Sequence, residues 1–233
     1  MIVHEVQQRS PEWCALRAGL PTSSEFSRIV TSAGEPSKSA YGYALTLAAE
    51  LFVGQSIDAW EGNAWTERGR ELEIAARAAY EFVCDVSVVP VGFVTDNSGM
   101  VGCSPDGFVG DDGLIEIKCL KAENHIKTIL YHRKHGRAPP DYMQQTQGQM
   151  WICERKWCDL VFYHPALPLL IVRETPNKFI IGALGASIPL VCKDRDEVLR
   201  ALREQAAPEG STPRKPIAIP TPSANIATAP PIF

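Results

Sequence analysis

Three side chains that suit cleavage of a phosphodiester stand close together near the middle of the chain. Asp106 follows Pro105 directly, and Glu116 and Lys118 come two residues apart a little later, within the segment MVGCSPDGFVGDDGLIEIKC (residues 100–119). Two carboxylates offer hard oxygen ligands, which suit Mg²⁺ or Mn²⁺ rather than zinc because no His/Cys cluster accompanies them. An ammonium group beside them can orient an attacking water or neutralise charge on a phosphoryl group. The pattern therefore indicates metal-assisted hydrolysis of a phosphodiester.

The same segment predicts the local structure that holds these groups. Two strand-like runs flank a Gly/Asp-rich turn at residues 110–113, which is typical of a hairpin. In the second run, alternation places Glu116 and Lys118 on one face of a strand, with Ile115 and Ile117 on the other. The backbone carbonyl of Ile117 is then a candidate third ligand for the metal. An E-x-K triplet alone also fits a surface ion pair on a hairpin, so the catalytic interpretation depends on the neighbouring elements.

A helix expected over residues 64–83 can supply a further acid to this site. It is rich in Ala, Glu and Arg and carries Glu67, Glu71 and Glu73. With a third carboxylate, two metal ions per site become possible, one for the attacking oxygen and one for the leaving oxygen.

A second helix, expected over residues 141–153, is unusually rich in glutamine. Amide side chains can hold water, a phosphate or a catalytic carboxylate without changing the charge of the site. For Gln144 and Gln147 we expect an ordinary polar helix surface.

The N-terminal region contains a candidate anion site. Thr22-Ser23-Ser24-Glu25 reads as a capping box that starts a short helix, and Arg17 precedes it by five residues. Free backbone N–H groups, two serine hydroxyls and a guanidinium suit a terminal phosphate of DNA. Alternatively, Thr22 caps the helix and Arg17 pairs with an acid.

Composition places the chain among ordinary globular proteins. It has 233 residues, of which 45% are hydrophobic and 21% charged, and it lacks both a long apolar stretch and a signal peptide. The seven cysteines are dispersed, which favours a reduced, cytoplasmic protein with no membrane segment. A net charge of −4 does not exclude nucleic acid, because residues 132–137 form a basic patch that either contacts DNA or is a solvated loop.

The remaining pattern predicts a mixed α/β domain over residues 1–207. Residues 1–20 look irregular, residues 177–192 are ambiguous, and a last helix is expected over about 195–206. Seven of the 18 prolines fall in residues 208–233, so this segment is expected to be a tail or an arm on a partner. The other expected strands are near 86–95, 100–103, 106–109, 114–119, 157–164 and 169–174, and the other expected helices are 40–53 and 121–133.

Taken in order, several stretches resemble the phage lambda-type exonucleases, or YqaJ-like viral recombinases, of the PD-(D/E)xK nuclease superfamily. They are SPEWCALRAGLPTSS (10–24), GRELEIAAR (69–77), GCSPDG (102–107) with GLIEIKC (113–119), and YMQQTQGQMW (142–151). The resemblance implies a restriction-endonuclease-like core, in which helices flank a central mixed β-sheet. It also implies Mg²⁺-dependent 5′→3′ digestion of one strand of duplex DNA to 5′-mononucleotides, with Mn²⁺ as a substitute and two ions per site.

The resemblance assigns roles residue by residue. The metal-binding acids are Asp106, Glu116 and the helix-borne Glu73. Lys118 and Gln145 are the active-site lysine and glutamine, and the 5′-phosphate pocket contains Arg17, Ser24 and Ser104. Trp65 is a candidate for prying open the terminal base pair, by stacking or wedging. Gln149 stands where many superfamily members carry a tyrosine.

Partners also follow from the resemblance. It implies double-stranded DNA ends as substrate, a ring-shaped homotrimer that encloses the DNA, and a single-strand annealing protein. It further implies a phage or prophage protein that acts in the cytoplasm of a bacterial host cell.

Three other functions fit parts of the sequence. An iron–sulfur nuclease would need four clustered cysteines. An endonuclease of restriction or repair type would nick circular DNA. A degenerate nuclease fold would bind DNA without cutting it.

Overall fold

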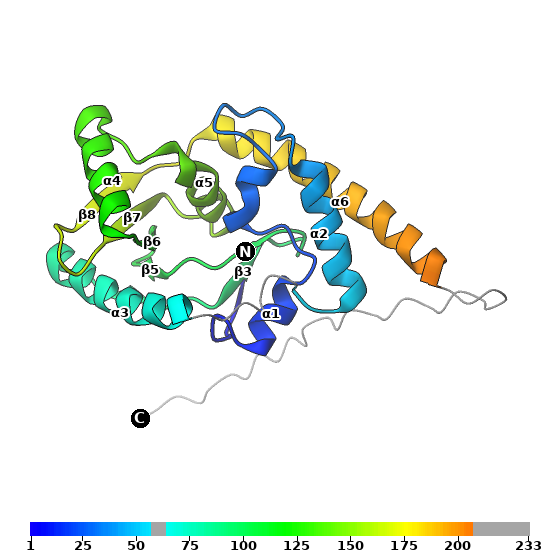
Figure 1. Ribbon diagram of the computed structural model, residues 1–233, viewed down its shortest axis with the longest axis horizontal. Helices are drawn as coiled ribbons and strands as arrows, with labels where there is room; N and C mark the ends of the chain where they lie inside the picture. Colours follow the sequence, from blue (N-terminus) through cyan, green and yellow to red (C-terminus); the bar gives the residue numbers. More distant parts are fainter. Residues whose placement is uncertain (57–63, 207–233) are drawn as a thin grey trace, which may run out of the picture.

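The protein is described from a computed structural model that covers residues 1–56 and 64–206, with side chains of the second range from residue 71 onward. The larger of two β-sheets has five strands in the order β2-β5-β6-β7-β8 (Figure 1). Strands β6 and β7 are parallel, while β2–β5, β5–β6 and β7–β8 are antiparallel, so the sheet is mixed. These strands are Val88–Val89 (β2), Gly107–Val109 (β5), Gly113–Cys119 (β6), Trp157–Tyr163 (β7) and Leu170–Glu174 (β8).

Parallel pairing of β6 with β7 requires a crossover, which helices provide. After β6 the chain forms α4 (Ala122–His135), the short turn η3 (Pro140–Tyr142) and α5 (Met143–Ile152) before it enters β7. Gly136, with φ 68°, ends α4 in the left-handed region, and Pro139 and Pro140 prevent the helix from resuming at once.

A second, three-stranded antiparallel sheet joins the N-terminus to the middle of the chain. Its order is β1-β3-β4, and Ile2 pairs with Thr95. The strands are Ile2–His4 (β1), Phe93–Thr95 (β3) and Gly102–Cys103 (β4), and nearby lie α1 (Pro11–Arg17) and the 3₁₀ helix η1 (Ser23–Arg28).

The helices cover the sheets from both sides. Helix α3 (Ala64–Cys84) packs on β6 and β7, where Ala76 and Tyr80 meet Ile115 and Ile117. On the other side α5 packs against η1, β4 and β7. The helices α2 (Ala40–Val53) and α6 (Lys178–Ala206) pack on each other and close the larger core (Figure 1). None of the described helices is long and apolar enough to cross a bilayer.

The mixed α/β architecture confirms the predicted fold class, and three local predictions need correction. The N-terminal residues contain β1 and α1 rather than irregular chain, because Ser10 caps α1 through the backbone N–H of Trp13. The strand expected near 86–95 divides into β2 and β3 around Pro90. The chain from Lys178 to Ala206 forms one helix, α6, that continues through Pro189, because buried Ile188 and its neighbours pack in the core beside α2.

The proposed boundary at residue 207 and the tail at 208–233 lie outside the described residues. A short helix does begin after Thr22, as the capping-box pattern predicts, but the Thr22 side chain makes no capping hydrogen bond there. Its hydroxyl instead accepts from the guanidinium of Arg17.

Candidate active site

Strand β6 places the predicted catalytic groups between two helices. Ile115 and Ile117 point into the core under α3, so Glu116 and Lys118 point to the opposite face, toward α5. Asp106 lies just before β5, and its backbone N–H donates to the carbonyl of Ile115 at 3.1 Å. The hairpin therefore brings Asp106, Glu116 and Lys118 together as predicted.

Glu116 is a buried carboxylate whose two oxygens are held by side chains. Gln145 Nε2 and Lys118 Nζ donate to Oε1 at 2.6 and 2.8 Å, and Gln149 Nε2 donates to Oε2 at 2.6 Å. Lys118 Nζ also donates to Gln145 Oε1 at 2.9 Å, which closes a triangle of three groups. Two of these partners are neutral amides, so they orient the carboxylate without neutralising it.

Asp106 lies in a negative environment. Burial raises the pKa of its carboxyl well above the usual value, and the nearby carboxylates of Glu116 and Glu73 raise that pKa further. The backbone N–H of Ile117, which donates to Asp106 Oδ2 at 2.5 Å, acts in the opposite direction. The negative charges of Glu116 and Glu73 therefore disfavour the charged form of Asp106, an effect that a nearby divalent cation would oppose.

Glu73 is the helix-borne acid of this group, but it also contacts arginines. Its carboxylate lies 3.8 Å from Arg9 and 3.7 Å from Arg77. In the described part of the chain no three His, Cys, Asp or Glu side chains already form a metal cage. Glu71 lies in the same helix, and the side chain of Glu67 is outside the described residues.

The ammonium of Lys118 is held in its charged form. Burial acts to lower the pKa of Lys118, but the attraction and hydrogen bond of Glu116 and the charge of Asp106 outweigh it, so the pKa is raised. Lys118 Nζ lies 5.6 Å from the ring centroid of Tyr142, the last residue of η3. The lysine is therefore a fixed positive charge beside the carboxylates.

The predicted anion site is also assembled. Arg17 donates to Thr22 at 3.2 Å and to Ser24 at 3.4 Å, and its guanidinium lies 4.3 Å from the ring centroid of Trp13. The indole N–H of Trp13 donates to Ser104 at 2.8 Å, so Trp13 links Arg17 to the third predicted residue of the pocket. Burial lowers the pKa of Arg17 relative to its usual value, although nearby Tyr43 and Glu50 counteract this shift.

The glutamine-rich helix differs from the sequence prediction. Gln144 and Gln147 are buried, not on a polar surface: they donate to the backbone carbonyls of Val30 and Thr175. Gln149, at the position where many superfamily members carry a tyrosine, is fully buried and donates to Glu116.

Sequence analysis missed two aromatic residues near the site. Trp13 stands four residues before Arg17 on α1, a spacing that puts both on one helix face, and Tyr142 stands three residues before Gln145. These spacings were the signals available. The side chain of Trp65, the candidate wedge, lies outside the described residues, and the basic residues 132–137 are at the end of α4 and in the following turn.

The cysteines do not form a cluster with metal-ligand geometry. All seven are free thiols in the described residues, and the closest contact is 3.4 Å between the buried sulfurs of Cys103 and Cys153. This arrangement gives no support to the iron–sulfur alternative.

Comparison with known proteins agrees with this geometry. The sequence model of the YqaJ-like viral recombinase domain family matches residues 12–156, a range that contains all the candidate catalytic residues described above. The chain belongs to this family. No curated protein sequence matches it significantly.

Two crystal structures of one similar enzyme support the assignment to the YqaJ-like family, and a third structure agrees in fold. An alkaline exonuclease from Laribacter hongkongensis, LHK-Exo, is 33% identical, with a TM-score of 0.73, over 84% of this chain and 98% of its own. The same enzyme in complex with dAMP matches at 32% identity and a TM-score of 0.74, with the same coverage. A phage-related exonuclease from Haemophilus somnus matches in fold, at 16% identity and a TM-score of 0.63, over 78% of this chain and 96% of its own. The predicted family and fold are confirmed, and together they support a nuclease role.

Proposed function

We propose that this protein is a Mg²⁺-dependent exonuclease that digests one strand of duplex DNA from its 5′ end and releases 5′-mononucleotides. The observation that carries the proposal is the pairing of two sites. The buried carboxylate–lysine group on β6 suits hydrolysis, and the Arg17 pocket beside it suits a terminal phosphate.

The carboxylates fit a hard divalent cation. Asp106 and Glu116 would hold it, with the carbonyl of Ile117 and Glu73 as further oxygen donors, directly or through water. The raised pKa of Asp106 supports this fit, because a cation would offset the effect of Glu116 and Glu73 on the Asp106 carboxyl. When bound, Mg²⁺ or Mn²⁺ would polarise the phosphodiester and activate water, and a second ion would stabilise the leaving oxygen.

The protein's own groups then have distinct tasks. Lys118, held as an ammonium between Glu116 and Gln145, would neutralise charge on the scissile phosphate and orient the attacking water. Gln145 and Gln149 hold Glu116 in position through hydrogen bonds to its two oxygens. Precise placement of these groups lowers the barrier because little reorganisation remains for the reaction itself.

The Arg17 pocket supports end dependence and 5′→3′ polarity. Ser104 is two residues before Asp106, so a 5′-phosphate bound by Arg17, Ser24 and Ser104 would lie next to the hydrolytic carboxylates. The structure of a 32% identical exonuclease with dAMP supports a mononucleotide product.

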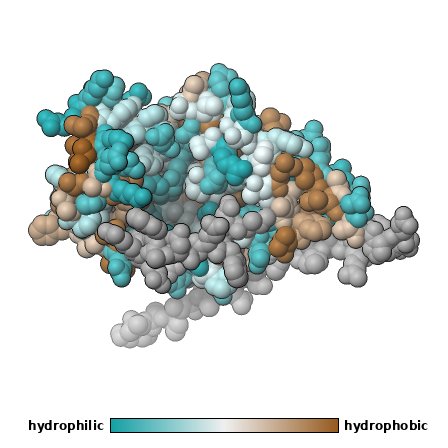
Figure 2. Space-filling model, in the orientation of Figure 1, coloured by the Kyte–Doolittle hydropathy of each residue, from teal (hydrophilic) through white to brown (hydrophobic). Residues whose placement is uncertain are grey.

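We further propose a homotrimeric ring that encloses DNA and passes the exposed strand to a single-strand annealing protein. Exposed apolar side chains on α2, at Tyr41, Leu45, Phe52 and Val53, support an assembly surface (Figure 2). Light scattering tests this directly, with three times the 25.6 kDa chain as the expected mass.

Digestion of linear and circular duplex DNA, with Mg²⁺ or with EDTA, tests the activity. We expect mononucleotides from the linear DNA only, none with EDTA, and loss of a 5′ label before a 3′ label. Nicking of the circle would instead identify an endonuclease. Binding without cleavage of either substrate would identify a non-catalytic module.

A further inference from the structure

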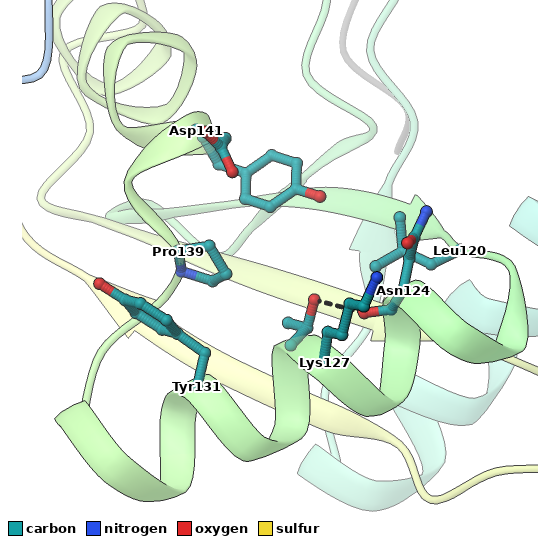
Figure 3. Close-up of a pocket in the computed structure, with 8 residues that line it drawn as sticks. Leu120, Asn124, Lys127, Tyr131, Pro139 and Asp141 are labelled. Carbon is teal, nitrogen blue, oxygen red and sulfur yellow. Dashed lines mark hydrogen bonds between the residues drawn. The ribbon is translucent and has the colours of Figure 1, made fainter.

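A groove between α4 and η3 lies beside the active site and has no role in the hydrolysis described above. It has a volume of about 380 Å³ and opens to solvent. Its walls come from α4 on one side and from Pro139, Asp141 and Tyr142 on the other (Figure 3). Helix α4 lines it with Asn124, Lys127, Thr128 and Tyr131, and Leu120 lines it from just before this helix.

The groove is connected to the catalytic group through Tyr142. The ring of Tyr142 lines the groove and also lies 5.6 Å from Lys118 Nζ. It packs edge-on against Phe162 of β7, with ring centroids 5.3 Å apart. A molecule that occupies the groove therefore contacts a residue next to the reacting centre.

The groove and the Arg17 pocket lie beyond opposite edges of the catalytic strand. The pocket is tied through Trp13 to Ser104, which precedes β5, and β5 pairs with one edge of β6. Tyr142 packs on β7, which pairs with the other edge of β6. A strand whose 5′ end is in the pocket and whose scissile phosphate is at β6 would reach the groove if it continued past β6 in the same direction.

The chemistry of the groove suits a nucleotide. Tyr131 and Pro139 offer flat apolar surfaces for a base, and the Tyr131 ring is itself supported by the ring of His135, with centroids 4.4 Å apart. The Asn124 amide and the Asp141 carboxylate can bond the polar edge of the base. Lys127, 68% exposed and paired with Glu123 at 2.6 Å, presents a cation to a phosphate. The face drawn in Figure 2 is hollowed beside α4, and hydrophilic residues line the hollow.

Local charge favours a polyanion here although the whole chain is acidic. Residues 121–141 contain five Lys or Arg against two acids, a balance of +3, while the chain carries −4. Their field attracts phosphates to this side of the molecule.

We propose that the α4–η3 groove binds the digested strand immediately 3′ of the scissile phosphate, with a base against Tyr131 and a phosphate at Lys127. This inference rests on the proposed exonuclease function, because it takes the 5′ end to be in the Arg17 pocket. The groove would hold the strand in place between successive cuts.

Single substitutions with matched controls test the groove. Tyr131→Ala should weaken binding of linear duplex DNA, measured in EDTA, by roughly 10-fold, the usual scale for one stacked base, and should raise KM while kcat stays within about twofold. Tyr131→Phe, which retains the ring, should behave as wild type. Lys127→Ala should lower the slope of log Kd against log salt by about 0.7–0.9. Lys193→Ala is the control, since Lys193 is a similarly exposed lysine on α6, 71% exposed and also paired with a glutamate four residues away.

Photo-crosslinking identifies the strand. A photoreactive base placed at the second or third nucleotide from the 5′-phosphorylated end should attach to residues 120–142, and the same base on the complementary strand should not. Unchanged affinity, KM and salt slope in the Tyr131 and Lys127 variants would overturn the groove assignment while leaving the nuclease intact. If wild-type protein cuts no DNA, the proposed function fails, and the binding and crosslinking results still decide whether the groove holds a strand.

Discussion

Gln149 offers the sharpest test of how the site is built. It is fully buried, donates to Glu116 Oε2 at 2.6 Å, and its own carbonyl oxygen has no partner among the described residues. Gln149→Leu keeps the volume but removes a hydrogen bond to a charged group, a loss of about 1.5–3 kcal/mol. The same change also removes an unpaired buried carbonyl, which offsets about 1–3 kcal/mol of that loss.

The net change in the free energy of unfolding should therefore be small, within about 2 kcal/mol in either direction. Activity should respond differently, because Glu116 loses the group that orients one of its oxygens. Loss of such a supporting bond to a metal ligand typically costs 10–100-fold in metal affinity or activity. We expect a fall of roughly that size at limiting Mg²⁺, partly restored by higher Mg²⁺.

Gln144 is a close control on the same helix. It is buried, donates one hydrogen bond and also has an unpaired carbonyl oxygen, but its acceptor is the backbone carbonyl of Val30, not a catalytic carboxylate. Gln144→Leu should leave both activity and Mg²⁺ dependence unchanged. The assay is digestion of 5′-phosphorylated linear duplex across a Mg²⁺ titration, with urea unfolding measured in parallel. Equal activity losses in the two variants, or none in Gln149→Leu, would refute the reasoning.

Four further outcomes are expected. Lys118→Ala should abolish cleavage but retain DNA binding, so substantial residual turnover would exclude its catalytic role. Arg17→Ala should cost roughly 10–100-fold on 5′-phosphorylated ends, as expected for lost charge-assisted hydrogen bonds, and much less on 5′-hydroxyl ends; equal losses on both would argue against the pocket. Pro189→Ala should raise the free energy of unfolding by about 1–3 kcal/mol, because an exposed helix interior disfavours proline, and a thermal melt measures it. Burial raises the pKa of Tyr43 from 10 to about 12, so its neutral form stabilises the fold fully below pH 10 and this contribution is lost by about pH 12. The difference in the free energy of unfolding between wild type and Tyr43→Phe should therefore become smaller from pH 10 to about pH 12. A difference that stays constant over this range would contradict the raised pKa of Tyr43.

The sequence was most informative where local pattern and chemistry coincide. Alternation in LIEIKC predicted which side chains of β6 face the site, because a strand half-buried under α3 must place Ile115 and Ile117 inward. The pocket around Arg17 needed more, since nothing local predicts that Trp13 reaches Ser104, 91 residues away. Only the family resemblance grouped Arg17, Ser24 and Ser104 beforehand, and it did not include Trp13.

Burial of the glutamine-rich helix could not be predicted from polarity. Gln144 and Gln147 satisfy backbone carbonyls of distant segments, and such partners are invisible in the sequence. Gly148 was a usable signal, because a glycine inside a helix often marks a close approach, and here the ring of Phe26 fills the space where a Cβ would stand. Pro189 hid the continuous helix, because a proline usually ends or kinks a helix. Here the packing of α6 against α2 overrides that preference.

The parallel pairing of β6 with β7 has a consequence for how the protein acquires activity during folding. The chain must close the loop of residues 120–156 before these strands meet, and contacts of such long range form slowly. Both glutamines that hold Glu116 come from this loop. A partly folded chain therefore lacks an organised hydrolytic site. Recovery of nuclease activity after dilution from denaturant should follow completion of the central sheet rather than the earlier formation of helices.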